Sequence, residues 1–86
     1  MDALYEGIDA YDAGDYHKAR ELFYPLAAYQ RNAEAQFYMG MIYFYGEGVD
    51  TDLDAAMEWW KKAMRQGHQD AAYRLSEIKT STKTTF

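Results

Sequence analysis

Apolar residues along the chain recur with the spacing of α-helices. Over residues 3–13 they occupy positions 4, 5, 8 and 11, and a second stripe consists of Ala19, Leu22, Phe23 and Leu26. Between the two stripes, Gly14 can end the first helix and Asp15 can cap the second. This pattern predicts a hairpin of two antiparallel helices over residues 3–30.

The same reasoning predicts three more helices. We expect the third over residues 33–45, the fourth from Asp52 to Gly67, and the fifth over residues 69–79. The fifth helix would form the capping segment of the domain, residues 68–79. The residues between the glycines are good helix formers. Residues 80–86 are rich in threonine, so we expect a flexible tail there. A chain of 86 residues has room for a single domain, residues 1–79.

The chain also repeats itself. With an offset of 37 residues, Asp15, Ala19, Glu21 and Phe23 match Asp52, Ala56, Glu58 and Trp60. With an offset of 36 residues, six positions in residues 27–42 match positions in residues 63–78. An alanine lets a neighbouring helix approach, and an aromatic ring four residues later fills the space beside it. One repeat unit is therefore a helix hairpin, as in solenoid arrays.

A longer pattern covers residues 33–67. It consists of Ala35, Met39-Gly40, Tyr43, Gly46-x-Gly48-Val49, Asp52, Ala56, Trp59-Trp60, Ala63 and Gln66-Gly67. This pattern resembles one complete Sel-one-like repeat (SLR), the longer relative of the tetratricopeptide repeat. Residues 7–30 are similar to the second half of a plainer tetratricopeptide-type hairpin, and residues 68–79 to the first helix of a further repeat. The chain departs from the family pattern at Met39, Met64 and Ser76.

The resemblance implies a specific architecture and a general function. It implies an all-α fold, a short right-handed α/α superhelix, or solenoid, of about five antiparallel helices. It also implies a protein-binding scaffold without catalysis, because such repeats serve as adaptors. It does not identify the partner, since one fold serves many functions.

The third predicted helix is apolar on more than one side. Ala35, Met39, Ile42 and Tyr43 form one stripe, which we expect to face the hairpin partner. Phe37, Met41, Phe44 and Tyr45 form a second stripe, which falls where tetratricopeptide-like arrays line a concave groove. The alternative, that the second stripe is ordinary core, stays open. The predicted partner-binding residues are Tyr11, Glu34, Phe37, Met41, Phe44, Tyr45, Tyr73 and Glu77.

The charge of the chain bears on its partners. Residues 1–60 carry twelve acids against three bases, whereas residues 61–86 carry six bases against two acids. An acidic body repels phosphate backbones, so nucleic acid is not expected as a ligand. Acids at Glu6, Asp9, Asp12 and Glu34 would favour a basic segment on a protein partner. The absence of cysteine and of an apolar membrane-length run favours a cytoplasmic protein that makes no membrane contact.

Other chemistry finds little support in the sequence. The acids around Asp52 lack the spacing of a calcium loop and are better explained as helix caps. The glycines of Gly46-Glu47-Gly48 follow a helix, so a turn is favoured over a phosphate site. His17 and His68 are expected on the solvated surface. We therefore expect no metal, no cofactor and no enzyme activity.

These observations favour a non-enzymatic protein–protein interaction module. It would bind a partner peptide or helix through an aromatic, acid-rimmed concave groove. Two alternatives stay open: a homodimerising structural scaffold, and an acidic inhibitor or immunity-type protein that blocks an enzyme.

Overall fold

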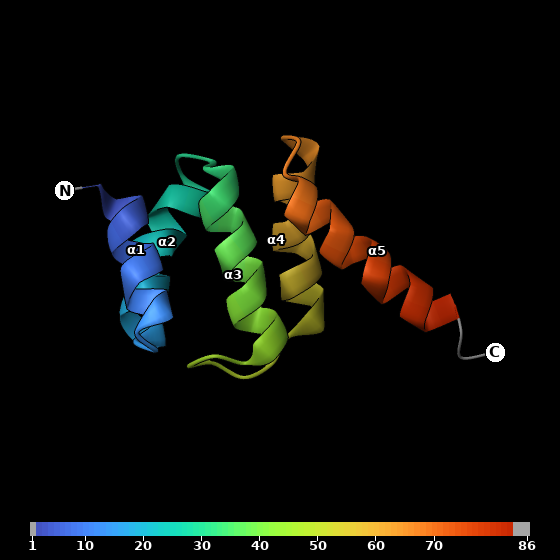
Figure 1. Cartoon of the computed structure of the whole chain (residues 1–86), viewed down its shortest axis with the longest axis horizontal. Coiled ribbons are helices and arrows are strands. Elements are labelled where there is room, and N and C mark those ends of the chain that lie inside the picture. The colour runs from blue at the N-terminus through green and yellow to red at the C-terminus, as the bar shows by residue number, and fades with distance from the viewer. Residues whose placement is uncertain (1, 84–86) are drawn as a thin grey trace.

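The computed structural model of the chain describes residues 2–83, with side chains described as far as Ile78. Figure 1 shows its five helices, α1 (Ala3–Asp12), α2 (Tyr16–Ala28), α3 (Ala33–Tyr45), α4 (Leu53–Arg65) and α5 (Gln69–Lys83). No strand occurs within residues 2–83. The predicted all-α fold is therefore confirmed.

The helix ends follow from capping chemistry. Each of the first four helices begins after a side chain that accepts a hydrogen bond from its first turn: Asp2, Asp15, Asn32 and Asp52. The predicted caps Asp15 and Asp52 are thus confirmed. Gly46 ends α3 in the left-handed conformation, with φ of 67°, as predicted for the glycine turn.

One predicted boundary differs from the structure. We expected α5 to end at residue 79, but it continues to Lys83. Part of the expected flexible tail is therefore helical, because helical hydrogen bonding overrides the low helix propensity of its threonines. Residues 84–86 of that tail lie outside the described residues.

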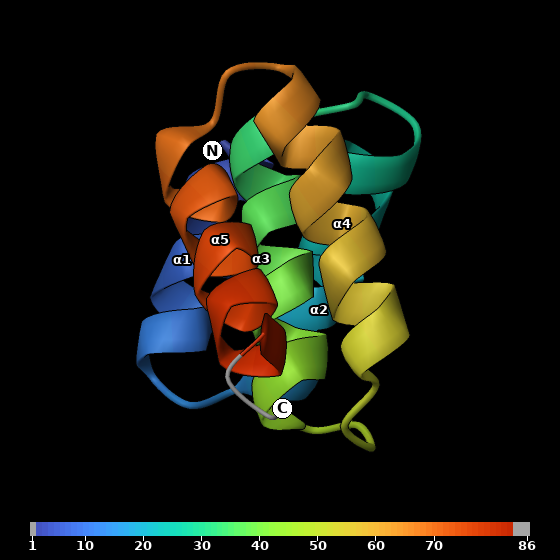
Figure 2. The ribbon, with the colours of Figure 1, turned by 90° about the vertical axis from the view of Figure 1, so that its right-hand side faces the viewer.

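The helices form a two-layer array. Successive helices pack against each other in chain order. Figure 2 shows α1, α3 and α5 in one layer and α2 and α4 in the other. The molecule is elongated along the array, with principal extents of 48 × 26 × 18 Å. This is the hairpin-after-hairpin arrangement that the internal repeat predicts.

The repeated alanine and aromatic positions form equivalent contacts in both hairpins. Ala19 and Phe23 on α2, like Ala56 and Trp60 on α4, are fully buried. Each ring rests on a glycine of the preceding helix. A Cβ atom at Gly7 would lie 2.7 Å from Cε1 of Phe23, and one at Gly40 would overlap the indole of Trp60. Glycine is therefore required for this close helix approach.

α3 is covered on two sides, which corrects one prediction. We expected the stripe of Ala35, Met39 and Ile42 to face α4. It packs in a cluster that is formed mainly by residues of α1 and α2, and Trp59 is the residue of α4 that joins this cluster. α4 instead meets the side of α3 that carries Phe37 and Gly40. The reason is that a middle helix of an array packs both on the preceding hairpin and on its own partner.

Candidate partner-binding surface

Two pockets lie between α3 and α5. Their volumes are about 460 Å³ and about 380 Å³, and both are lined by Arg74 and Glu77. We call the two pockets together the α3–α5 groove. Its lining residues are Phe37, Phe44, Tyr45, Leu53, Trp60, Asp70, Tyr73, Arg74, Glu77 and Ile78.

The groove exposes several large side chains. Tyr45 is 50% exposed, Tyr73 is 63% exposed and Leu53 is 45% exposed. The hydroxyl of Tyr45 accepts a hydrogen bond from Nη1 of Arg74 at 2.8 Å, which links the end of α3 to the middle of α5. Exposed tyrosine and leucine beside polar groups are typical of protein-binding surfaces.

The predicted second stripe has a more buried base. Phe37, Met41 and Phe44 are half-buried and pack on a cluster that includes Trp60 and Leu75. The ring of Phe44 lies 5.3 Å from the indole of Trp60. These residues therefore connect α3 to α4 and α5. Phe37 and Phe44 also line the groove, whereas Met41 does not.

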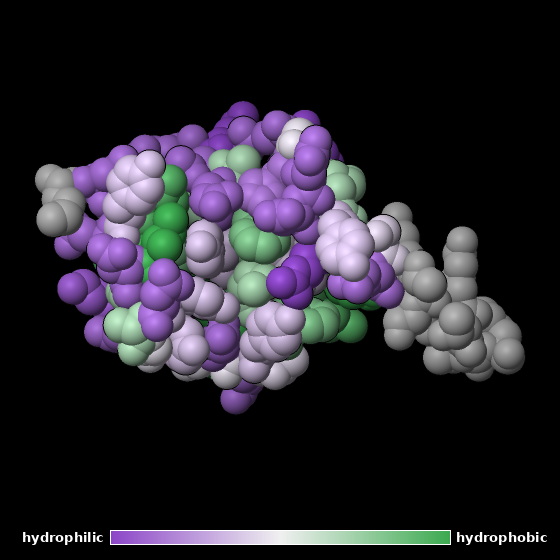
Figure 3. Space-filling view, in the orientation of Figure 1, coloured by the Kyte–Doolittle hydropathy of each residue, from purple (hydrophilic) through white to green (hydrophobic). Residues whose placement is uncertain are grey.

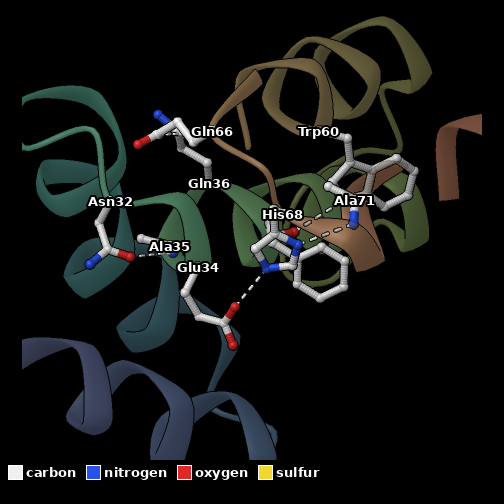
Figure 4. Close-up of polar contacts among 9 residues, drawn as sticks. Asn32, Glu34, Ala35, Gln36, Trp60, Gln66, His68 and Ala71 are labelled. Atoms are coloured by element: carbon white, nitrogen blue, oxygen red, sulfur yellow. Dashed lines mark hydrogen bonds and ion pairs between the residues drawn. The ribbon is translucent and has the colours of Figure 1, made fainter. Parts of the chain in front are cut away.

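A polar cluster lies beside Phe37 at the start of α5 (Figure 4). Nε2 of His68 lies 2.6 Å from Oε1 of Glu34, and Nδ1 of His68 accepts the backbone N–H of Ala71 at 3.1 Å. The imidazole also stacks on the ring of Phe37, with centroids 4.7 Å apart. The prediction that His68 lies on the solvated surface is wrong, because its side chain is only 12% exposed. The side chain caps α5 and anchors it to α3.

Two side-chain amides, of which that of Gln36 is buried, tie the same end of α3 to α2 and α4. Gln36 is 3% exposed, and its Nε2 donates to the carbonyl of Ala27 at 3.1 Å. Its Oε1 accepts from Nε2 of Gln66 at 3.0 Å, a pair drawn in Figure 4. Both polar ends of this buried side chain are thereby satisfied.

Tyr11 does not join the α3–α5 groove. Its hydroxyl donates to Oε1 of Glu47 at 2.6 Å, and its ring packs edge-on against Tyr16 and Tyr38. Burial, together with the hydrogen bond and negative charge of Glu47, raises the pKa of the Tyr11 hydroxyl. The negative charge of Glu47 also raises the pKa of Tyr16. Tyr11 thus links α1 to the turn that follows α3.

The expected acidic rim is divided. Glu6 and Asp9 line a separate hollow with Asp15 and Lys18, near the turn between α1 and α2. Glu34 stays near Phe37 through His68. Within the α3–α5 groove the acids are instead Asp70 and Glu77, with the basic Arg74 between them.

Sequence reasoning missed two contacts beside the groove and five residues that line it: Leu53, Trp60, Asp70, Arg74 and Ile78. Arg74 shares the helical face of Asp70 and Glu77, so the spacing i, i+4, i+7 could have identified it. Tyr38 packs beside Phe37, with ring centroids 5.8 Å apart, and touches Tyr11 on its other side. The pairing of His68 with Glu34 spans 34 residues and has no local sequence signal.

Figure 3 shows the α1, α3 and α5 side of the molecule as a surface. Apolar patches lie over α1 and near the middle of this side, between hydrophilic side chains. In the part of the chain that the structure describes, no helix is long and apolar enough to cross a membrane. No group of three or more metal-ligating side chains gathers within the same residues.

Comparison with known proteins connects this architecture to a family. The family model of the Sel1 repeat matches residues 2–28 and 33–68. The chain is similar to an exopolysaccharide production negative regulator of Rhizobium meliloti (strain 1021), with 33% identity over 57 residues. That match covers 66% of this chain and 21% of the regulator, so the chain spans about a fifth of that relative. No solved structure gives a significant match. The chain belongs to the Sel1 repeat family, whose repeats mediate protein–protein interactions.

Proposed function

We propose that this protein is a non-enzymatic interaction module that binds a peptide or helix of a partner protein in the α3–α5 groove. The observation that carries the proposal is the exposure of Tyr45, Leu53 and Tyr73 around two pockets that share Arg74 and Glu77. Aromatic side chains supply large contact areas with little loss of conformational entropy, and are enriched in binding surfaces.

The floor of the groove supports this assignment. Phe37, Phe44 and Trp60 hold the base in place because they also belong to the contacts between α3 and α4. A rigid floor with exposed aromatic edges lowers the cost of ordering the surface when a partner binds. The groove can therefore accept an apolar anchor without rearranging the helices.

The charges of the groove indicate the chemistry of the partner. Asp70 and Glu77 line it, and Arg74 is held by the hydroxyl of Tyr45. A partner segment with a lysine or arginine beside an apolar anchor fits this arrangement. Attraction between opposite charges speeds association, so added salt should slow the encounter.

The test is to replace the two exposed tyrosines. Tyr45→Ala with Tyr73→Ala removes aromatic surface from the groove and leaves the buried floor in place. We expect the amount of partner captured from host lysate, quantified by mass spectrometry, to fall by about tenfold, because aromatic anchors dominate interface energy. The melting temperature should stay close to that of the wild type.

The matched control replaces two exposed apolar side chains elsewhere, Tyr5→Ala with Met64→Ala. These side chains are 64% and 39% exposed and line neither the groove nor the other large pocket. Capture should be unchanged by the control pair. Equal capture by wild type, groove variant and control would exclude the groove as the binding site.

The alternatives make different predictions. A homodimerising scaffold would sediment as a dimer whose fraction increases with protein concentration. The double substitution of Tyr45 and Tyr73 would then lower the apparent molecular mass of the assembly rather than the capture of another protein. An inhibitor would instead be captured with an enzyme whose activity falls on binding. Sedimentation and an activity assay of the captured protein separate these outcomes.

A further inference from the structure

A second pocket lies on the α2 and α4 side of the molecule and differs in charge from the rest of the surface. Its volume is about 520 Å³. It is lined by Ala27, Ala28, Arg31, Gln36, Trp59, Lys62, Arg65 and Gln66. Three of the nine basic residues of an acidic chain meet here, and no acidic side chain lines the pocket. We call it the basic pocket.

Among the side chains that the structure describes, the three cations of the basic pocket, Arg31, Lys62 and Arg65, have no ion-pair partner. Lys62 and Arg65 lie in the last turn of α4, where positive charge stabilises a helix end. That reason does not extend to Arg31, which lies in the loop between α2 and α3.

Arg31 occupies a costly backbone position. Its φ is 54°, the left-handed region in which glycine or asparagine is favoured. Its carbonyl accepts a hydrogen bond from Nε2 of Gln66 at 2.7 Å, which holds the loop against the end of α4. This hydrogen bond involves only the backbone of Arg31, so a glycine or an asparagine in the same left-handed conformation could also form it. The arginine side chain is not needed for the loop conformation, and what it contributes is a positive charge in the pocket.

Aromatic side chains extend the basic pocket along the same side. Trp59 lines it and is half-buried, in contrast to the fully buried Trp60. The ring of Tyr24 lies 6.2 Å from Trp59, and Tyr29 lies 6.1 Å from Tyr24. A ligand with negative charge could therefore also place an apolar side chain on this row.

We propose that the basic pocket binds a short acidic segment of a partner protein, with its carboxylates on Arg31, Lys62 and Arg65 and an apolar side chain on Trp59. Arginine pairs well with carboxylates because its guanidinium donates two parallel hydrogen bonds. A nucleic acid is disfavoured because a continuous phosphate backbone would pass over the acidic remainder of the surface. This site is distinct from the α3–α5 groove, because no residue lines both.

The experiment uses a fluorescein-labelled peptide of six glutamates around a central leucine, with fluorescence anisotropy as the measurement. The test variant combines Arg31→Asn, Lys62→Gln and Arg65→Gln, in which asparagine preserves the left-handed backbone. The control variant removes the same charge elsewhere through Lys18→Gln, Arg20→Gln and Lys61→Gln. Circular dichroism establishes that both variants fold.

We expect the dissociation constant of the peptide to rise about tenfold or more in the test variant and by less than about threefold in the control. The reason is that salt at physiological concentration screens charges that lie far from the bound peptide. Binding of the same peptide without its fluorescein label should also change the tryptophan fluorescence, because the half-buried Trp59 lines the pocket.

Three results would overturn the proposal. One is no binding of the peptide by the wild type, and another is an equal loss of binding in both variants. The third is that the wild type binds a single-stranded oligothymidine more tightly than the peptide, or that the chain associates with itself, and that the test variant alone loses this binding or association. These readings do not involve Tyr45 or Tyr73, so they are distinguishable from failure of the α3–α5 groove.

Discussion

At the scale of single residues, Tyr11 shows how one hydroxyl fixes the relation between two hairpins. Its hydrogen bond to Glu47 joins α1 to a turn 36 positions along the chain. The turn also packs closely on α2, because a Cβ atom at Gly48 would lie 3.2 Å from Cβ of Tyr16. The contact of this turn with the first hairpin therefore includes a hydrogen bond from a phenol to a carboxylate.

This arrangement predicts a loss of stability in alkaline solution. The pKa values of Tyr11, Tyr16 and Tyr38 are raised above the ordinary phenol value of 10.0. As the pH rises, the unfolded chain therefore releases these protons before the folded chain does. The contribution of the three protonated tyrosines to the free energy of unfolding is thus fully present below about pH 10 and is lost as the pH rises beyond it. The free energy of unfolding, measured with urea from pH 8 to 11, should decline at the alkaline end.

Tyr11→Phe should reduce the slope of that decline, and it should also lower stability at pH 8 by about 1 kcal/mol through the lost hydrogen bond. Tyr29→Phe is the matched control, since Tyr29 is exposed. Identical slopes in the wild type and Tyr11→Phe would show that Tyr11 does not contribute to the alkaline loss of stability.

At the scale of helices, the sequence predicts the ends well and the faces less well. Asp15, Asp52 and Gly46 are local signals, because a cap acts on residues a few positions away. The faces of α3 depend on which helices lie beside it. Since α3 is apolar on two sides, Ala35 and Phe37 could each have faced either neighbour. The contacts of His68 and Arg74 depend on residues about thirty positions away, which no local pattern specifies.

The close approach of α3 and α4 gives a prediction at this scale. Gly40→Ala should destabilise the protein by about 1–3 kcal/mol, because the added methyl group would overlap the indole of Trp60. This cost exceeds the gain of about 1 kcal/mol that alanine brings to a helix interior. Thermal or urea unfolding measures the change.

The combination of Gly40→Ala with Trp60→Leu tests the mechanism. If overlap with the indole causes the loss, adding Gly40→Ala should cost less in the Trp60→Leu background than in the wild type. Equal costs in both backgrounds would contradict it.

At the scale of the whole molecule, stability should vary along the array. α3 packs on α2 and α4, whereas α5 packs mainly on α4. A repeat array opens from positions with fewer neighbours. Amide hydrogens of α5 should therefore exchange with solvent through openings of lower free energy than those of α3, as measured by hydrogen exchange with NMR. Equal protection of the two helices would indicate a single cooperative unit.

The contact of an aromatic ring with a glycine also limits how such an array can be lengthened by design. Gly7 receives Phe23 and Gly40 receives Trp60, while the corresponding position of α5 is Ser76. A tandem copy of the 53–65 helix placed after α5 would bring its tryptophan onto a serine side chain. An engineer who wants to extend the array with this unit must first restore glycine at Ser76 or replace that tryptophan with a smaller residue.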